Sequence, residues 1–220
     1  MRKLRLVIFS LLTVNYSLLT YPGFAEDCLQ YKTIPSLEIK VPSHFVSIVK
    51  PDRRMDLLHG NVVSTFSEEY EIEYGAERIN AGGLPPEAKG EGWCIFIENI
   101  TAIIGYTDFV VQIDKRHSFD SCEFKGILEH EEEHIRAHLS VVEDEQKDIL
   151  RAIQDAANNV LPVFVKDESG FDSAMNDIED MLQKRPEIRL LRQKLAAEQE
   201  IRNKKIDLID KGHRVKACGD

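Results

Sequence analysis

The sequence is short of positive charge and has no long apolar segment. It contains 28 Lys and Arg residues against 38 Asp and Glu residues, which gives a formal net charge of −10 at pH 7. This balance argues against nucleic acids and anionic membranes as partners, because both are negatively charged themselves. The longest mostly apolar run, residues 7–19, falls short of the roughly 18 unbroken apolar residues that a membrane span needs. Internal repeats and low-complexity tracts are also absent.

The run at residues 7–19 is typical of a secretory signal peptide. It follows the basic start MRKLR, and the small residues Gly23 and Ala25 stand at positions −3 and −1 of a cut after residue 25. We therefore expect residues 1–25 to be a signal peptide. The mature chain would begin at Glu26 and be secreted or periplasmic, with no membrane insertion after cleavage.

The chain has four cysteines and no C-x-x-C pair, so a zinc site made of cysteines is not expected. An even number of cysteines in an exported chain predicts disulfide bonds instead, and four cysteines allow three connectivities. We favour a Cys94–Cys122 bond, because these residues flank the strongest strand signal and the start of a helix. Cys28–Cys218 would then join the two termini.

The most informative motif is His-Glu-x-x-His at residues 130–134. On a helix, His130 and His134 lie on one face, about 5–6 Å apart at Cβ, and can bind one Zn²⁺ through neutral imidazoles. Glu131 points about 100° away from His130, so it can miss the metal and still reach a water molecule beside it. This arrangement of two ligands and a base is typical of zinc hydrolases.

The alternative is a solvated, Glu-rich helix that carries two histidines by chance. The helical phases favour the metal site. With His130 at 0°, the apolar positions of the helix centre near about 130°, whereas His134 and His138 fall at about 40° and 80°. The histidines therefore flank the buried face, where a cleft is expected, while Glu129 and Glu132 point to the opposite side.

The pattern around this motif predicts an α+β fold. Residues 93–104 and 109–114 read as two antiparallel strands joined near Gly105, and this hairpin leads into a helix from Cys122 to about residue 159. Asp120 or Ser121 can cap that helix. We expect an antiparallel β-sheet, the long His-Glu-x-x-His helix and two further C-terminal helices, as in zincins.

The second of these C-terminal helices would begin at Pro186 and end near residue 211. We expect both helices to pack on the first long helix. A coiled-coil arm is the weaker alternative, because the heptads are not sustained. The domains would be a metallohydrolase core at residues 26–161 and a C-terminal helical segment at residues 162–220.

A catalytic zinc normally has three protein ligands. His138 is the first candidate for the third, although it lies about 12 Å along an unbroken helix from His130 and would need the helix to bend. The other candidates are His117 before the helix, and Asp177, Glu179 and Asp180 after it, which would match a thermolysin-like arrangement. The metzincin pattern is excluded, because Ala137 and Ser140 stand where it needs Gly and His.

Residues 93–153 resemble a family of secreted bacterial proteins that are described as predicted zinc-dependent proteases. The resemblance is carried by Trp93-Cys94, Ile100-Thr101, Ile104-Gly105-Tyr106, Val111-x-Ile113 and Ser121-Cys122-x-Phe124, leading into Leu128-x-His130-Glu131-x-x-His134. That family tends to have Asp or His at the position of His138, so the resemblance favours His138 as a ligand.

These observations predict an exported zinc-dependent hydrolase, in first place a metallopeptidase acting on a peptide or protein. Glu131 would be the general base, and Tyr106 or His117 would stabilise the oxyanion. The main alternative is a non-catalytic periplasmic binding or scaffold protein with a structural or empty metal site. A metal-sequestering protein is the third. The sequence leaves the substrate and the oligomeric state open.

Overall fold

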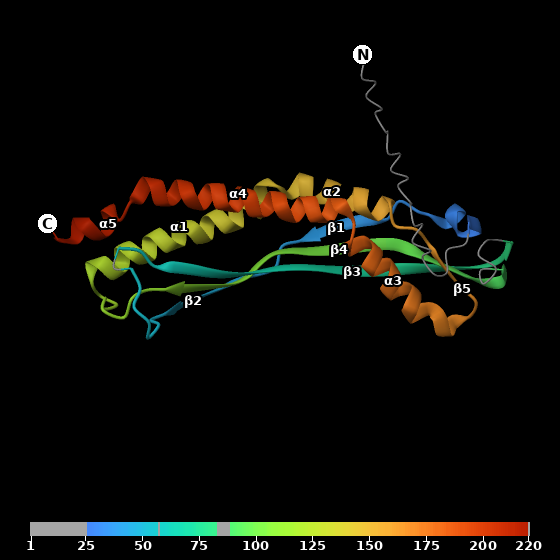
Figure 1. The fold of residues 1–220 in the computed structure, drawn as a ribbon, viewed down its shortest axis with the longest axis horizontal. Coiled ribbons are helices and arrows are strands. Elements are labelled where there is room, and N and C mark those ends of the chain that lie inside the picture. The colour runs from blue at the N-terminus through green and yellow to red at the C-terminus, as the bar shows by residue number, and fades with distance from the viewer. Residues whose placement is uncertain (1–25, 57, 83–88, 220) are drawn as a thin grey trace, which may run out of the picture.

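The computed structural model describes residues 26–56, 58–82 and 89–219, so the predicted signal peptide lies outside the described residues. Figure 1 shows an elongated molecule in which α1, α2 and α4 lie along one side of a long β-sheet. In the described part of the chain, no helix is long and apolar enough to cross a membrane.

The sheet is built on one central strand, β4 (Lys89–Gln112). On one side, β3 (Asn61–Gly82) pairs with it in antiparallel orientation over its whole length. On the other side, β1 (Ser36–Lys40) and β2 (Phe45–Val49) run parallel to β4, and the short β5 (Val163–Val165) runs antiparallel. The prediction of an antiparallel sheet is therefore wrong, because two of the four neighbours of β4 are parallel to it.

The predicted hairpin at Gly105 is also wrong, because β4 continues through this residue. Phe66 pairs with Tyr106 and Thr65 with Asp108, so the irregularity is a one-residue bulge in β4 rather than a turn. A Cβ atom at Gly105 would lie 2.8 Å from Cδ of Pro42. Gly105 therefore permits the close approach of the segment between β1 and β2. From the sequence alone, this glycine is interpreted as a turn residue instead.

The helices predicted to begin at Cys122 and Pro186 do so, but the first, predicted to continue to about residue 159, is broken at Glu145. The helices are α1 (Cys122–Asp144), α2 (Gln146–Asn158), α3 (Phe171–Gln183), α4 (Pro186–Asp210) and the short α5 (His213–Lys216). Short 3₁₀ turns lie at Glu26–Tyr31, Glu168–Gly170 and Ala217–Gly219. The predicted cap is present, since Ser121 Oγ accepts a hydrogen bond of 3.1 Å from the N–H of Phe124. The break at Glu145 could not be predicted from the sequence, because the helical spacing of apolar residues continues from α1 into α2.

The core lies between the sheet and the helices. Fully buried side chains of β4, such as Ile104 and Phe109, belong to one apolar cluster with Ile127 of α1 and Ile149 of α2. The N-terminal half of α4 joins this cluster through Ile188, Leu191 and Leu195. Burial of these branched and aromatic side chains is the main stabilisation of the fold.

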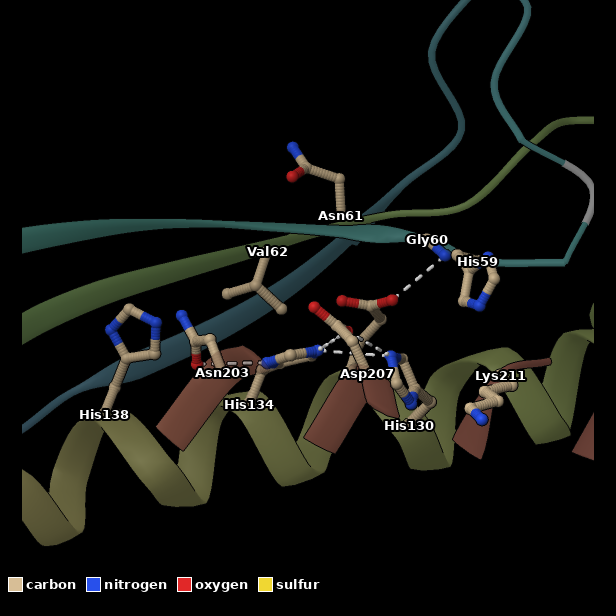
Figure 2. Close-up of a pocket in the computed structure, with 11 residues that line it drawn as sticks. His59, Gly60, Asn61, Val62, His130, His134, His138, Asn203, Asp207 and Lys211 are labelled. Carbon is tan, nitrogen blue, oxygen red and sulfur yellow. Dashed lines mark hydrogen bonds and ion pairs between the residues drawn. The ribbon is translucent and has the colours of Figure 1, made fainter. Parts of the chain in front are cut away.

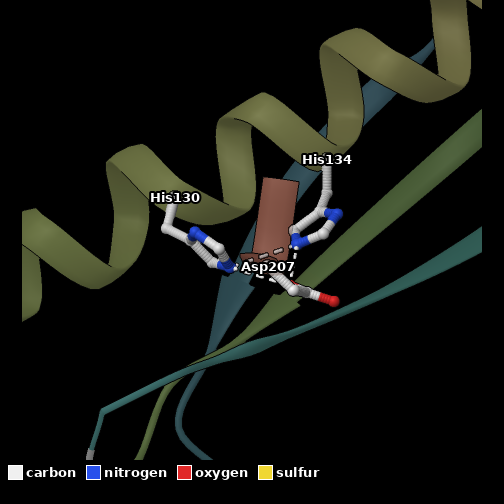
Figure 3. Close-up of side chains that lie close together, drawn as sticks. All are labelled: His130, His134 and Asp207. Atoms are coloured by element: carbon white, nitrogen blue, oxygen red, sulfur yellow. Dashed lines mark hydrogen bonds and ion pairs between the residues drawn. The ribbon is translucent and has the colours of Figure 1, made fainter. Parts of the chain in front are cut away.

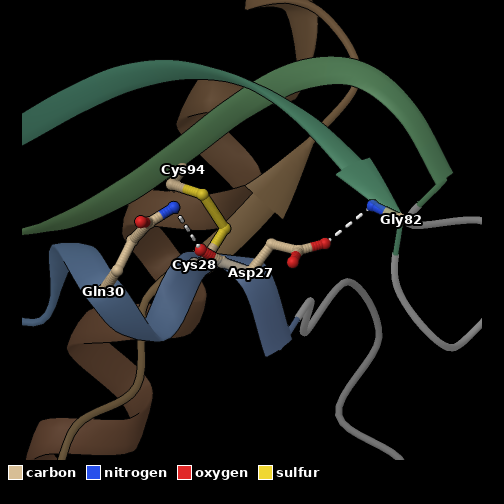
Figure 4. The surroundings of a disulfide bond; sticks show 5 residues. All are labelled: Asp27, Cys28, Gln30, Gly82 and Cys94. Carbon is tan, nitrogen blue, oxygen red and sulfur yellow. Dashed lines mark hydrogen bonds between the residues drawn. A yellow bond between two sulfur atoms is a disulfide. The ribbon is translucent and has the colours of Figure 1, made fainter.

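All four cysteines form disulfide bonds, as predicted, but the favoured pairing is wrong. The bonds are Cys28–Cys94 and Cys122–Cys218. Cys94 lies near the start of β4 and α1 begins after its end, so about 60 Å of extended strand separates Cys94 from Cys122. Figure 4 shows Cys28 beside Cys94, where the Asp27 carboxylate also accepts a hydrogen bond of 2.7 Å from the N–H of Gly82. Each bond therefore fixes one end of the molecule.

Candidate metal centre

The two histidines of the motif point to the same place from successive turns of α1. Both are almost completely buried, with exposed fractions of 2% for His130 and 8% for His134. Their Nε2 atoms lie 3.1 Å apart. Figure 3 shows both rings turned toward one carboxylate on another helix, that of Asp207.

Asp207 comes from α4 and completes a cluster that could hold a metal ion. Its Oδ1 lies 3.0 Å from Nε2 of His134 and 3.3 Å from Nε2 of His130. Ligand atoms about 2.0–2.1 Å from a tetrahedral zinc ion are about 3.3–3.4 Å from one another. The triangle formed by the two nitrogens and the oxygen is therefore close in size to one face of a zinc coordination tetrahedron. The Asp207 side chain is 57% exposed, so the cluster is accessible from solvent.

His138 lies outside this cluster. Its Nδ1 is 3.4 Å from Ser64 Oγ, and its ring packs edge-on against Tyr106, with ring centroids 4.8 Å apart. Because α1 continues regularly to Asp144, the helix does not bend to bring His138 toward His130. His138 nevertheless lines the same pocket.

The other predicted candidates for a third ligand are also elsewhere. His117 lies in the loop before α1, where its carbonyl oxygen accepts a hydrogen bond of 2.6 Å from Lys50 Nζ. Asp177, Glu179 and Asp180 are on α3, which packs against β4 and β5. The cluster among the described residues includes none of them.

A signal for Asp207 is present in the sequence but was missed. The side of α4 that faces the core carries apolar residues in its first half. In its second half the same side carries the polar residues Gln199, Asn203 and Asp210, and Asp207 lies next to them. Charged and amide side chains on the buried side of a helix need polar partners. In this protein Asn203, Asp207 and Asp210 lie against the histidines of α1, and Gln199 bonds to Tyr106 and Asn203.

Residues of α4 also orient the two imidazole rings. Asn203 Oδ1 lies 3.1 Å from His134 Nδ1, and Gln199 Nε2 donates to the same oxygen at 3.0 Å. Asp210 Oδ2 lies 2.9 Å from His130 Nδ1, although the two atoms are not aligned for a straight hydrogen bond. Acceptors at both Nδ1 atoms favour the tautomer with a proton on Nδ1, which leaves each Nε2 lone pair free for a metal.

The environment also shifts the acid–base properties of the site. Burial, and secondly the charge of His134, lower the pKa of His130, and the carboxylates of Asp210 and Asp207 oppose this shift. A lowered pKa favours the neutral imidazole that binds a metal. Burial raises the pKa of Glu131, against the opposing effects of His134 and of a hydrogen bond of 2.9 Å from the N–H of Gly60 to Oε1. A carboxylate with a raised pKa is a better base near neutral pH.

A pocket of about 520 Å³ surrounds the cluster (Figure 2). It is lined by His59, Gly60, Asn61, Val62, His130, Glu131, His134, His138, Asn203, Asp207 and Lys211. Gly60 cannot be replaced without movement, because a Cβ atom there would lie 2.9 Å from Cγ of Glu131 and 2.8 Å from the carbonyl oxygen of Gln112. The start of β3 is thereby held directly against the side chain of Glu131.

No family model, curated protein or solved structure matches this chain.

The C-terminal half of α4, which carries Asp207, is held on α1 mainly by polar contacts. Arg202 Nη1 of α4 lies 2.7 Å from the carboxylate of Asp144. In α5, which follows α4 and also contacts α1, Arg214 Nη2 lies 2.6 Å from the carboxylate of Glu133. The Cys122–Cys218 bond then ties the end of the chain to the first residue of α1. The position of Asp207 therefore depends on a docked C-terminal segment.

We expect Asp207→Ala to weaken zinc binding by more than about 100-fold, because it removes one of three donors. Asp177→Ala, on α3, and His138→Gln should bind zinc as the unchanged protein does. Competition with a chromophoric chelator measures these affinities. Loss of zinc in His138→Gln with full retention in Asp207→Ala would contradict the assignment of the third ligand.

Removal of the C-terminal disulfide should loosen the metal site, whereas removal of the other disulfide should not. Both Cys122→Ser/Cys218→Ser and Cys28→Ser/Cys94→Ser should lose about 2–5 kcal/mol of stability. Only the first pair should also weaken zinc binding, by about 10-fold, because it frees the segment next to Asp207. Equal zinc affinities in the two double variants would show that α4 holds Asp207 without the covalent tie.

His138 should make the metal-free protein less stable in acid. Burial, and secondly the charge of His134, lower its pKa to about 4. Between pH 6.5 and pH 4 the unfolded chain therefore binds a proton that the folded chain does not, so stability falls as the pH falls, by up to about 3 kcal/mol. Urea unfolding with a chelator at pH 7 and pH 4.5 should show a smaller loss for His138→Gln. The same loss in both proteins would refute this role.

Proposed function

We propose that the protein is an exported zinc-dependent hydrolase that cleaves peptide bonds. The observation that carries the proposal is the meeting of three metal donors, from two helices, beside a buried carboxylate in a solvent-accessible pocket. Three protein ligands with an open position are typical of catalytic zinc sites, whereas structural sites have four. The two disulfides are compatible with a secreted protein, because such bonds persist in oxidising compartments.

His130, His134 and Asp207 would hold the zinc ion. When bound, the metal lowers the pKa of a water molecule toward about 7 and polarises a carbonyl group. Glu131 would take the proton from the attacking water and then deliver it to the leaving amine. The N–H of Gly60 fixes one of its carboxylate oxygens during these transfers.

The residues that would stabilise the oxyanion differ from the predicted ones. The Tyr106 hydroxyl donates to Gln199 Oε1 at 3.4 Å, and Tyr106 is not among the described residues that line the pocket. His59 and Lys211 line the pocket, and the centroids of the His59 and His130 rings are 5.7 Å apart. We assign these two residues as the donors that face the developing negative charge.

The sheet supports a peptide as the substrate. In the described part of the chain, β3 pairs with β4 alone, so its other edge is open. That edge starts at Asn61, which lines the pocket. An extended peptide can add to an open edge through main-chain hydrogen bonds, and a peptide bound there would reach the metal donors.

Glu131→Gln should retain zinc and lose about 10²–10⁴-fold in turnover, because the amide cannot accept the proton. Glu132→Gln is the matched control, since Glu132 lies on the solvated side of α1 near Arg136. Cleavage of an unfolded protein and of a peptide library by the zinc-loaded mature chain provides the assay.

Full turnover in Glu131→Gln would refute the role of this residue. The absence of cleavage of any peptide by a zinc-loaded protein would refute the peptidase and favour the binding or scaffold protein.

A further inference from the structure

The outer face of α4 carries an apolar stripe that no described residue covers. Leu190, Ile201 and Leu208 have exposed fractions of 59%, 60% and 67%, and Ala197 is exposed between them. At 100° per residue, these four side chains fall within about 40° of one another on the helix. They lie opposite the buried apolar residues that attach α4 to the core. A single exposed leucine would need no explanation, but an aligned row does.

The sequence spacing of the four stripe residues is the same when it is counted from either end of the helix. The steps between the four residues are 7, 4 and 7, and residue 199 is the midpoint both of Leu190 and Leu208 and of Ala197 and Ile201. A helix with such a stripe can pair with a second copy of itself in antiparallel orientation about a two-fold axis at residue 199. Leu190 would then meet Leu208 of the second copy, and Ala197 would meet Ile201.

We propose that this stripe is a homodimer interface, in which two α4 helices pack antiparallel. Closed two-fold symmetry requires a self-complementary patch, and the stripe is one. Antiparallel pairing also sets a small side chain, Ala197, against a large one, Ile201. Parallel pairing would set alanine against alanine and leave a gap, which close packing disfavours. The proposal is independent of the proposed function.

The size of the stripe indicates how tightly the two copies would associate. The stripe is about 27 Å long, and one helix face of that length covers less than the roughly 800 Å² per partner of a standard interface. We therefore expect a weak, reversible dimer rather than a permanent one. The buried side of α4, with Gln199 and Asp210, faces away from this contact, so the metal pocket stays open in the dimer.

Charge beside the stripe opposes the contact. Lys194 and Lys205 flank the same side of it, and the two-fold axis brings Lys194 near Lys205 of the second copy. Lys194 is partly neutralised in its own chain by Glu145, at 2.5 Å, and by Asp148. Because salt screens the remaining repulsion, the dimer should become tighter as the salt concentration rises.

Sedimentation equilibrium of the mature chain with both disulfides intact tests the interface. Ala197→Glu should abolish the dimer, whereas Ala196→Glu should leave it unchanged, since Ala196 is equally an exposed alanine but points about 100° away from the stripe. Thermal unfolding should show that both variants are folded. A monomer at all concentrations up to about 200 μM, or the same dissociation constant in both variants, would overturn the proposal.

Cross-linking tests the orientation. Chains with Leu190→Cys mixed with chains with Leu208→Cys should form a disulfide-linked dimer under oxidation. Neither variant alone should do so, because identical positions at these ends are about 27 Å apart in the antiparallel pair. A cross-link in Leu190→Cys alone would indicate parallel helices and overturn the proposed arrangement.

Discussion

The packing of α4 on α1 is the contact on which the site depends. Two histidines on one helix supply only two ligands, and the third donor comes from Asp207, which lies 73 residues after His134 in the chain. The apolar half of α4 attaches the helix to the core, and its polar half supplies both a ligand and the acceptors that fix the imidazole rings. The N-terminal half of α4 thus contributes to the core, and its C-terminal half contributes Asp207 to the cluster.

The long strands pack against this helix pair at the Glu131 carboxylate. β4 packs against α1. Gly60, directly before β3, donates its N–H to Oε1 of Glu131 at 2.9 Å. Burial raises the pKa of Glu131, although the hydrogen bond from Gly60 opposes this shift. Glu131 lies on α1 beside the histidines, and the sheet contacts its carboxylate through Gly60, the residue before β3. The pocket therefore lies where the sheet and the helices meet.

Local features of the fold could be predicted from the sequence, and distant pairings could not. The cap at Ser121, the starts of α1 and α4 and the shared face of His130 and His134 depend on residues within one or two helical turns. The cysteine pairing and the parallel partners of β4 depend on where distant segments meet. The turn predicted at Gly105 was wrong because the sequence alone does not distinguish a glycine that permits a close approach from one that forms a turn.

The coordination of zinc in the mature protein tests the central claim most directly. Anomalous diffraction from crystals of the zinc-loaded protein should place the metal about 2.0–2.1 Å from Nε2 of His130, Nε2 of His134 and Oδ1 of Asp207. The remaining position should hold solvent and face Glu131. A metal bound by His138 instead of Asp207, or closed off by a fourth protein ligand, would contradict this account.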